Sequence, residues 1–145
     1  MLDAMNRQED SPSPALDAAR LAWLEEAIKP ALDLLLQTGR FSPTLYLHGA
    51  GQTEACELSP REMAELREAA VDRIRQAPAD VEGYVLMYPS TIRFGEKPYT
   101  VLIVEVAGSE DAEAQELARR YWRAEKRVAD SFDRLGRLDN LLDRA

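Results

Sequence analysis

Histidine and cysteine are almost missing from this chain of 145 residues, with His48 and Cys56 as the single copies. One cysteine cannot form an intramolecular disulfide, and one histidine with one cysteine cannot supply a multi-ligand zinc site. The sequence therefore predicts a fold that depends on neither a disulfide nor a metal, and it gives no reason to expect a cofactor. It also offers few parts for catalysis, and we assign no catalytic residue.

Long hydrophobic runs are missing as well. No apolar stretch approaches the roughly 18 residues of a membrane-spanning helix. Residues 1–7 lack the basic start and apolar centre of a secretory signal. We therefore expect a soluble cytoplasmic protein that does not enter a membrane.

Acidic side chains outnumber basic ones by 26 to 18, which gives a net charge of −8. Most of the excess lies in residues 1–109, with 17 acidic and 10 basic side chains, whereas residues 110–145 carry 9 and 8. This balance makes general nucleic-acid binding unlikely, because most of the surface would repel a polyanion.

The length and the 46% hydrophobic content fit one domain over residues 13–145, after a disordered polar leader at 1–12. Ser13 and Pro14 resemble the start of an amphipathic helix that runs to Gly39, with a break near residues 27–29 caused by Pro30. A capping box at residues 59–62 predicts a second helix, which ends before Pro78.

Two pairs of apolar segments predict β-hairpins. Residues 44–48 and 53–58 flank a glycine-rich turn, and residues 84–88 and 101–104 flank the turn segment at 95–98. The second pair does not alternate between apolar and polar residues, so both faces of these strands should be covered. We expect the chain's own helices on one face and further protein on the other.

The segment 110–145 carries apolar residues at heptad spacing and predicts a long C-terminal helix. The expected fold class is α+β, an antiparallel sheet from two β-hairpins with three amphipathic helices, in the order α-ββ-α-ββ-α. In size, acidic balance and element order this resembles the small dimeric chaperones of bacterial secretion systems, which implies a homodimer that binds another protein. The candidate interface on this helix consists of Val128, Phe132, Leu135 and Leu142.

Glu105 interrupts an apolar strand, so its carboxylate could be partly buried and suited to acid-base chemistry. A solvated strand end, or a pair with Arg93 or Lys97, is the simpler interpretation. If a pocket lies between the sheet and the helices, the candidate lining residues are Glu105, Tyr84, Tyr88 and His48.

Three further possible functional sites each have a simpler structural explanation. His48 and Cys56 lie on the two arms of the first hairpin and could form a nucleophilic pair, but Cys56 has the strand parity of a core residue. The glycines at 49–51 could cradle a phosphate, but a strand follows them where a phosphate loop needs a helix. Residues 119–127 are basic with interleaved aromatic side chains and could contact a nucleic-acid backbone or an acidic partner. However, acidic residues four positions before basic ones occur in this part of the sequence and are typical of a solvated helix face.

Three functions remain open from the sequence. The first is a non-enzymatic homo-oligomeric binding, adaptor or chaperone-like module. The second is a small-molecule-binding domain or enzyme. The third is a nucleic-acid-contacting module, which would require the basic row in residues 119–127 to face solvent unpaired.

Overall fold

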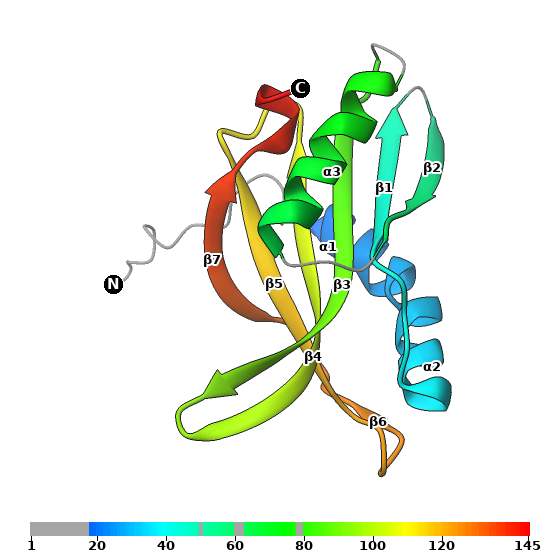
Figure 1. The fold of residues 1–145 in the computed structure, drawn as a ribbon, viewed down its shortest axis with the longest axis vertical. Helices are drawn as coiled ribbons and strands as arrows, with labels where there is room; N and C mark the ends of the chain where they lie inside the picture. The colour runs from blue at the N-terminus through cyan, green and yellow to red at the C-terminus, as the bar shows by residue number, and fades with distance from the viewer. Residues whose placement is uncertain (1–17, 50, 60–62, 78–79) are drawn as a thin grey trace.

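A long antiparallel β-hairpin forms the centre of the protein (Figure 1). The computed structural model describes residues 18–49, 51–59, 63–77 and 80–145. Strands β3 (Gly83–Phe94) and β4 (Lys97–Gly108) pair along their whole length. Gly95 in the turn has a φ of 68°, a conformation that glycine adopts without strain. This confirms the second predicted hairpin.

Further antiparallel strands extend the sheet on both sides. β1 (Thr44–Gly49) pairs with β3 and with β2 (Gln52–Glu57), which confirms the first hairpin. On the other side β5 (Glu113–Trp122) pairs with β4. The outer edge of β5 takes β7 (Asp133–Asp139) and the short β6 (Arg127–Val128). The strand order is β2-β1-β3-β4-β5, and the sheet curls like half a barrel (Figure 1).

A bent helix covers one face of this sheet. It consists of α1 (Ala18–Ala27) and α2 (Lys29–Thr38), which meet at Ile28 because Pro30 in the first turn of α2 cannot donate a backbone hydrogen bond. Gly39 ends α2 with a φ of 74°. The predicted break and the predicted end of this helix are confirmed.

Helix α3 (Met63–Gln76) covers the other face. Neighbouring residues of β4 show the division: Leu102 packs under the bent helix, and Ile103 packs under α3. Both side chains are at most 2% exposed. The chain's own helices therefore cover both faces of the hairpin strands. The expectation that further protein covers one of these faces is wrong.

The predicted C-terminal helix is also wrong. Residues 110–145 form β5, β6, β7 and a short 3-10 turn (Leu141–Asp143). The fold is mostly β, with one bent helix and one further helix, so the α-ββ-α-ββ-α arrangement and the resemblance that rested on it do not hold.

Backbone hydrogen bonding along the edge of β4 explains why residues 110–145 form strands and not a helix. Residues 101–108 of β4 are buried on both faces, so the backbone N–H and C=O groups along the free edge there need hydrogen-bond partners. β5, itself largely buried on both faces, supplies them. Asp111, which the helix prediction placed at a helix start, instead closes a turn by accepting a 2.7 Å hydrogen bond from the backbone N–H of Gly108. Gly136, with a φ of 150°, lies at an irregularity in the β5–β7 pairing.

Some expectations lie outside the described residues. These are the leader at 1–12, the helix start at Ser13 and Pro14, and residues 60–62 of the capping box.

Candidate functional site

Glu105 lies inside the protein, on the face of the sheet that α3 covers. Its side chain is 2% exposed. Arg67 of α3 donates to both carboxylate oxygens, Nε to Oε1 and Nη2 to Oε2, each at 3.0 Å. The Tyr84 hydroxyl donates to Oε2 at 2.5 Å. The pairing expected with Arg93 or Lys97 is therefore wrong, as is the solvated strand end.

Arg67 and Tyr84 connect this carboxylate to the C-terminal segment. Arg67 also donates to Oδ1 of Asp139 at 2.9 Å and to the Asp139 carbonyl oxygen at 2.7 Å. The backbone N–H of Leu141 donates to the Tyr84 hydroxyl at 3.3 Å. We call Glu105, Arg67, Tyr84 and Asp139 the Glu105 cluster. It joins α3, β3, β4 and the chain end.

Electrostatics fix the charge states within this cluster. Burial alone would lower the pKa of Arg67, but its bonds to Glu105 and Asp139 raise it above the ordinary value. Burial, and then the neighbouring charge of Glu105, raise the pKa of the Tyr84 hydroxyl. The guanidinium therefore stays charged and the phenol neutral at physiological pH.

Glu116 of β5 stands directly opposite Glu105 in the strand register. Burial, and then the Glu105 charge, raise the pKa of Glu116, while Arg67 opposes the shift. Burial and the two glutamates also raise the pKa of Tyr88. Acid-base chemistry would need a carboxylate within reach of a substrate. Arg67 and Tyr84 already occupy both oxygens of Glu105, so this carboxylate acts as a structural ion.

His48 lies apart from the other three candidate pocket residues, on the face of the bent helix. Its ring lies against that of Trp23, with the centroids 5.4 Å apart and the planes tilted by 39°. It lies directly over Gly83, where an added Cβ would come within 2.8 Å of Nε2. Together with Ala19, Arg20 and Val106, these two rings line a cavity of about 330 Å³. Burial, and then the charge of Arg20, lower the pKa of His48, while Glu82 opposes the shift.

The structure does not bring His48 and Cys56 together. Cys56 packs with the α3 side of the core, where Nη2 of Arg73 lies 3.0 Å from its Sγ. The nucleophilic pair is therefore not formed.

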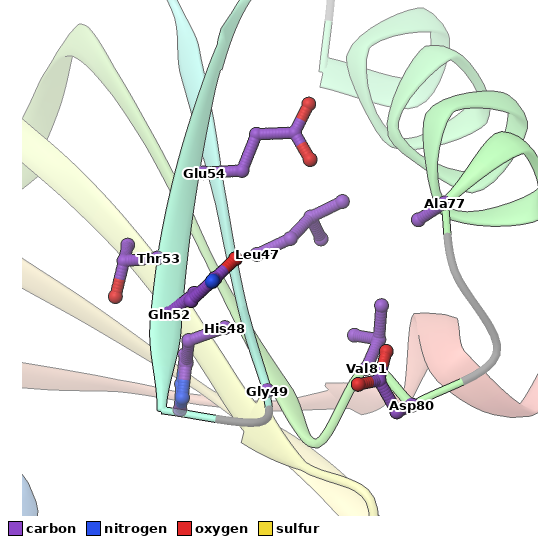
Figure 2. Close-up of a pocket in the computed structure, with 9 residues that line it drawn as sticks. All are labelled: Leu47, His48, Gly49, Gln52, Thr53, Glu54, Ala77, Asp80 and Val81. Atoms are coloured by element: carbon purple, nitrogen blue, oxygen red, sulfur yellow. The ribbon is translucent and has the colours of Figure 1, made fainter.

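A small pocket lies between the end of the β1–β2 hairpin and the segment that joins α3 to β3 (Figure 2). Its volume is about 170 Å³, which is below the usual range of ligand pockets. Glu54 and Asp80 supply carboxylates, and Glu54 lies 3.5 Å from the guanidinium of Arg73. Gly49 is required here, because a Cβ would come within 2.2 Å of the Asp80 carbonyl oxygen. Figure 2 shows the His48 ring turned away from the Leu47 side chain.

Two cavities on the opposite face form a groove beside the bent helix. One, of about 150 Å³, lies between α1 and β7, and the other, of about 320 Å³, lies between the bent helix and the residues around β6. Glu25 lines both, and its carboxylate accepts a 2.5 Å hydrogen bond from Nη2 of the buried Arg119. We call this surface the bent-helix groove. Its apolar lining residues are Leu21, Ile28, Leu32, Leu117, Val128, Ala129 and Phe132.

The four candidate interface residues are divided between the two faces. Val128 and Phe132 line the bent-helix groove. Leu135 and Leu142 pack partly buried against the core under α3. They form no common stripe, because a strand and a turn replace the predicted helix.

The basic segment at 119–127 likewise changes its arrangement. Arg119 is 4% exposed and paired with Glu25, and Arg120 pairs with Asp133 at 2.9 Å. The unpaired solvent-facing row that a nucleic-acid helix would need is not formed.

Sequence reasoning missed Arg67, Asp139, Leu21 and Glu25. Arg67 follows Leu66 of the buried α3 stripe, which places it at the margin of that stripe. Its partners lie 38 and 72 residues away, and Glu25 lies 94 residues from Arg119. No local pattern indicates contacts over such separations.

Within the part of the chain that the structure describes, no group of three or more His, Cys, Asp or Glu side chains could hold a metal ion. Nor does any helix in those residues have the length and apolar character to span a membrane. Comparison of the chain with protein-family models, with curated proteins and with solved structures gave no match.

Proposed function

We propose that the protein is a non-enzymatic binding module that holds an apolar segment of a partner protein in the bent-helix groove. The observation that carries this proposal is the groove itself, two cavities that each combine apolar with charged lining residues and that share Glu25 of one ion pair. Leu21, 38% exposed at the rim, offers apolar surface to a partner.

The groove suggests the chemistry of its occupant. Each cavity can take a large apolar side chain, and the Glu25 carboxylate between them, on a side chain 39% exposed, can accept a hydrogen bond from a backbone N–H of the partner. A partner segment with two apolar anchors around a central polar stretch fits this arrangement. Lys29 and Asp33 on one side and Arg134 on the other give the rim mixed charge, which favours no strongly charged peptide.

The proposal is preferred to a small-molecule enzyme because of the state of Glu105. That alternative relied on this carboxylate in a pocket, and Arg67 and Tyr84 bind both of its oxygens. We further propose that the protein works in a reducing cytoplasm, where its single thiol, Cys56, stays free.

Selection from a displayed peptide library tests the groove. Peptides selected on the full chain should carry two large apolar residues, and Leu21→Asp should weaken their binding at least tenfold. Leu34→Asp is the matched control, because Leu34 is 46% exposed on α2 and lines neither cavity. Peptides whose affinity is unchanged by Leu21→Asp would contradict the proposal.

The same variants test self-association in place of a different partner. If a second copy occupies the groove, light scattering will show a doubled mass that Leu21→Asp, but not Leu34→Asp, returns to the monomer value.

A further inference from the structure

The fold gathers positive charge at one end of an acidic protein. Residues 90–100 of the β3–β4 hairpin and residues 120–127 at the β5–β6 turn together carry six Arg or Lys and two Glu. The rest of the chain carries 12 basic and 24 acidic side chains. Both hairpins extend from the same end of the molecule, below α3 in Figure 1. We call these two segments the basic end.

Aromatic side chains connect the two segments. Tyr99 lies edge-on to Phe94 at 5.6 Å and to Trp122 at 6.4 Å between ring centroids. The Arg120 guanidinium lies over Phe94 and over Tyr99, at 5.1 and 5.2 Å from their ring centroids. Arg127 lies over Trp122 at 3.8 Å. Rings and guanidinium groups therefore alternate across the basic end.

Most of the positive charge at this end is not neutralised by carboxylates. Within the described residues, its ion pairs are the partly buried pair of Arg120 with Asp133 and the exposed pair of Arg127 with Glu125. Arg93 and Arg123 donate to the backbone carbonyl oxygens of Glu96 and Gln37, which carry no formal charge. Lys97 and Lys126 are exposed. A polyanion would therefore meet four basic side chains without a carboxylate partner.

We propose that the basic end binds single-stranded nucleic acid. Exposed Arg and Lys side chains attract the phosphates, and unpaired bases stack on aromatic rings and on guanidinium planes. Arg127, stacked on Trp122 and 55% exposed, offers such a plane. An acidic peptide would use the charges but not the stacking surfaces. The acidic remainder of the protein repels the strand elsewhere, which confines it to this end.

This inference is independent of the bent-helix groove. The basic end consists of residues outside the groove lining. It does not require an exposed row of arginines over residues 119–127, in which Arg119 would have to take part, because Arg119 is buried beside the groove.

Fluorescence anisotropy of a labelled oligothymidylate of about 15 nucleotides with the full chain tests the proposal. We expect binding that weakens steeply as salt rises. The double variant Lys97→Glu/Lys126→Glu should bind at least tenfold more weakly. Arg75→Glu/Arg137→Glu makes the same charge change at exposed positions outside the basic end and should bind within about twofold of the wild type. Equal loss in both double variants would overturn the site.

Two further arms separate stacking from charge alone. Trp122→Leu should lower the affinity about fivefold or more, because stacking contributes about 1–3 kcal/mol per base. A poly-glutamate peptide of matched charge should bind at least tenfold more weakly than the oligonucleotide. If the peptide binds as tightly, the basic end takes an acidic protein segment and the nucleic-acid proposal is wrong. Circular dichroism checks the fold of each variant, and the lysine variants decide the case should Trp122→Leu unfold.

Discussion

Arg67 and Glu105 face each other across the interface between α3 and the sheet, joined by two N–H···O bonds of 3.0 Å. The Glu105 side chain is 2% exposed and that of Arg67 is 11% exposed, so neither charge has much water around it. A buried pair of this kind adds little net stability over apolar residues of the same shape, but it penalises the loss of either partner.

Arg67→Met should therefore destabilise the protein by about 3 to 5 kcal/mol, because it leaves the Glu105 carboxylate buried without its cation. Urea unfolding at neutral pH measures the change. Adding Glu105→Gln to Arg67→Met should recover part of the loss, since the double variant has no buried charge at this position. If the free energy of unfolding of Arg67→Met alone lies within about 1 kcal/mol of the wild-type value, water must solvate Glu105 in that variant.

Sequence reasoning succeeded where structure is decided locally. The break of the first helix follows from Pro30, its end from Gly39, and the central turn from Gly95. Each depends on the backbone preference of one residue, which can be read without knowing the rest of the fold.

Sequence reasoning failed where the structure depends on contacts between residues far apart in the chain. Leu135, Leu138 and Leu142 have helical spacing, but β5 pairs with the open edge of β4, and β7 pairs with β5. The position of Glu105 could be suspected from its strand, whereas its partner Arg67 lies 38 residues away on a helix. Pairing of this kind depends on tertiary packing, which overrides local periodicity.

Leu102→Ala and Ile103→Ala should each cost about 2 to 5 kcal/mol, the usual range for truncating a buried aliphatic side chain. The two residues lie on opposite faces of β4, under the bent helix and under α3. Their effects in a double variant should therefore be nearly additive. Chemical denaturation tests both points, and losses below about 1 kcal/mol would place the core elsewhere.

We expect a monomer in the absence of a partner, with a mass near 16.3 kDa by light scattering at micromolar concentration. The expected homodimer relied first on a long C-terminal helix, which the structure replaces with strands, and second on an open hairpin face, which α3 covers. Within the described residues the exposed large hydrophobic side chains are Leu21 and Leu34 on the two halves of the bent helix and Met63 on α3. A stable doubled mass would contradict this expectation and return the bent-helix groove to consideration as a self-interface.

His48 should make the protein less stable as the pH falls. Burial and the charge of Arg20 hold its pKa below the ordinary value, and the opposing Glu82 does not restore it. The unfolded chain takes up the proton near pH 6.5, whereas the folded protein resists it to lower pH. The unfolded state therefore binds more protons in this window, and the free energy of unfolding decreases as the pH drops below about 6.5.

The variant His48→Gln isolates this effect, because the chain has no other histidine. Between about pH 7.5 and pH 5.5, the melting temperature of the wild type should fall by more than that of His48→Gln. The raised pKa of Glu116 acts in the opposite direction, since the folded protein holds that proton more readily, but this contribution is present in both proteins and cancels in the comparison. Parallel melting curves for the two proteins across this range would mean that the imidazole is as well solvated in the folded state as in the unfolded chain, and that its contact with Trp23 does not persist in solution.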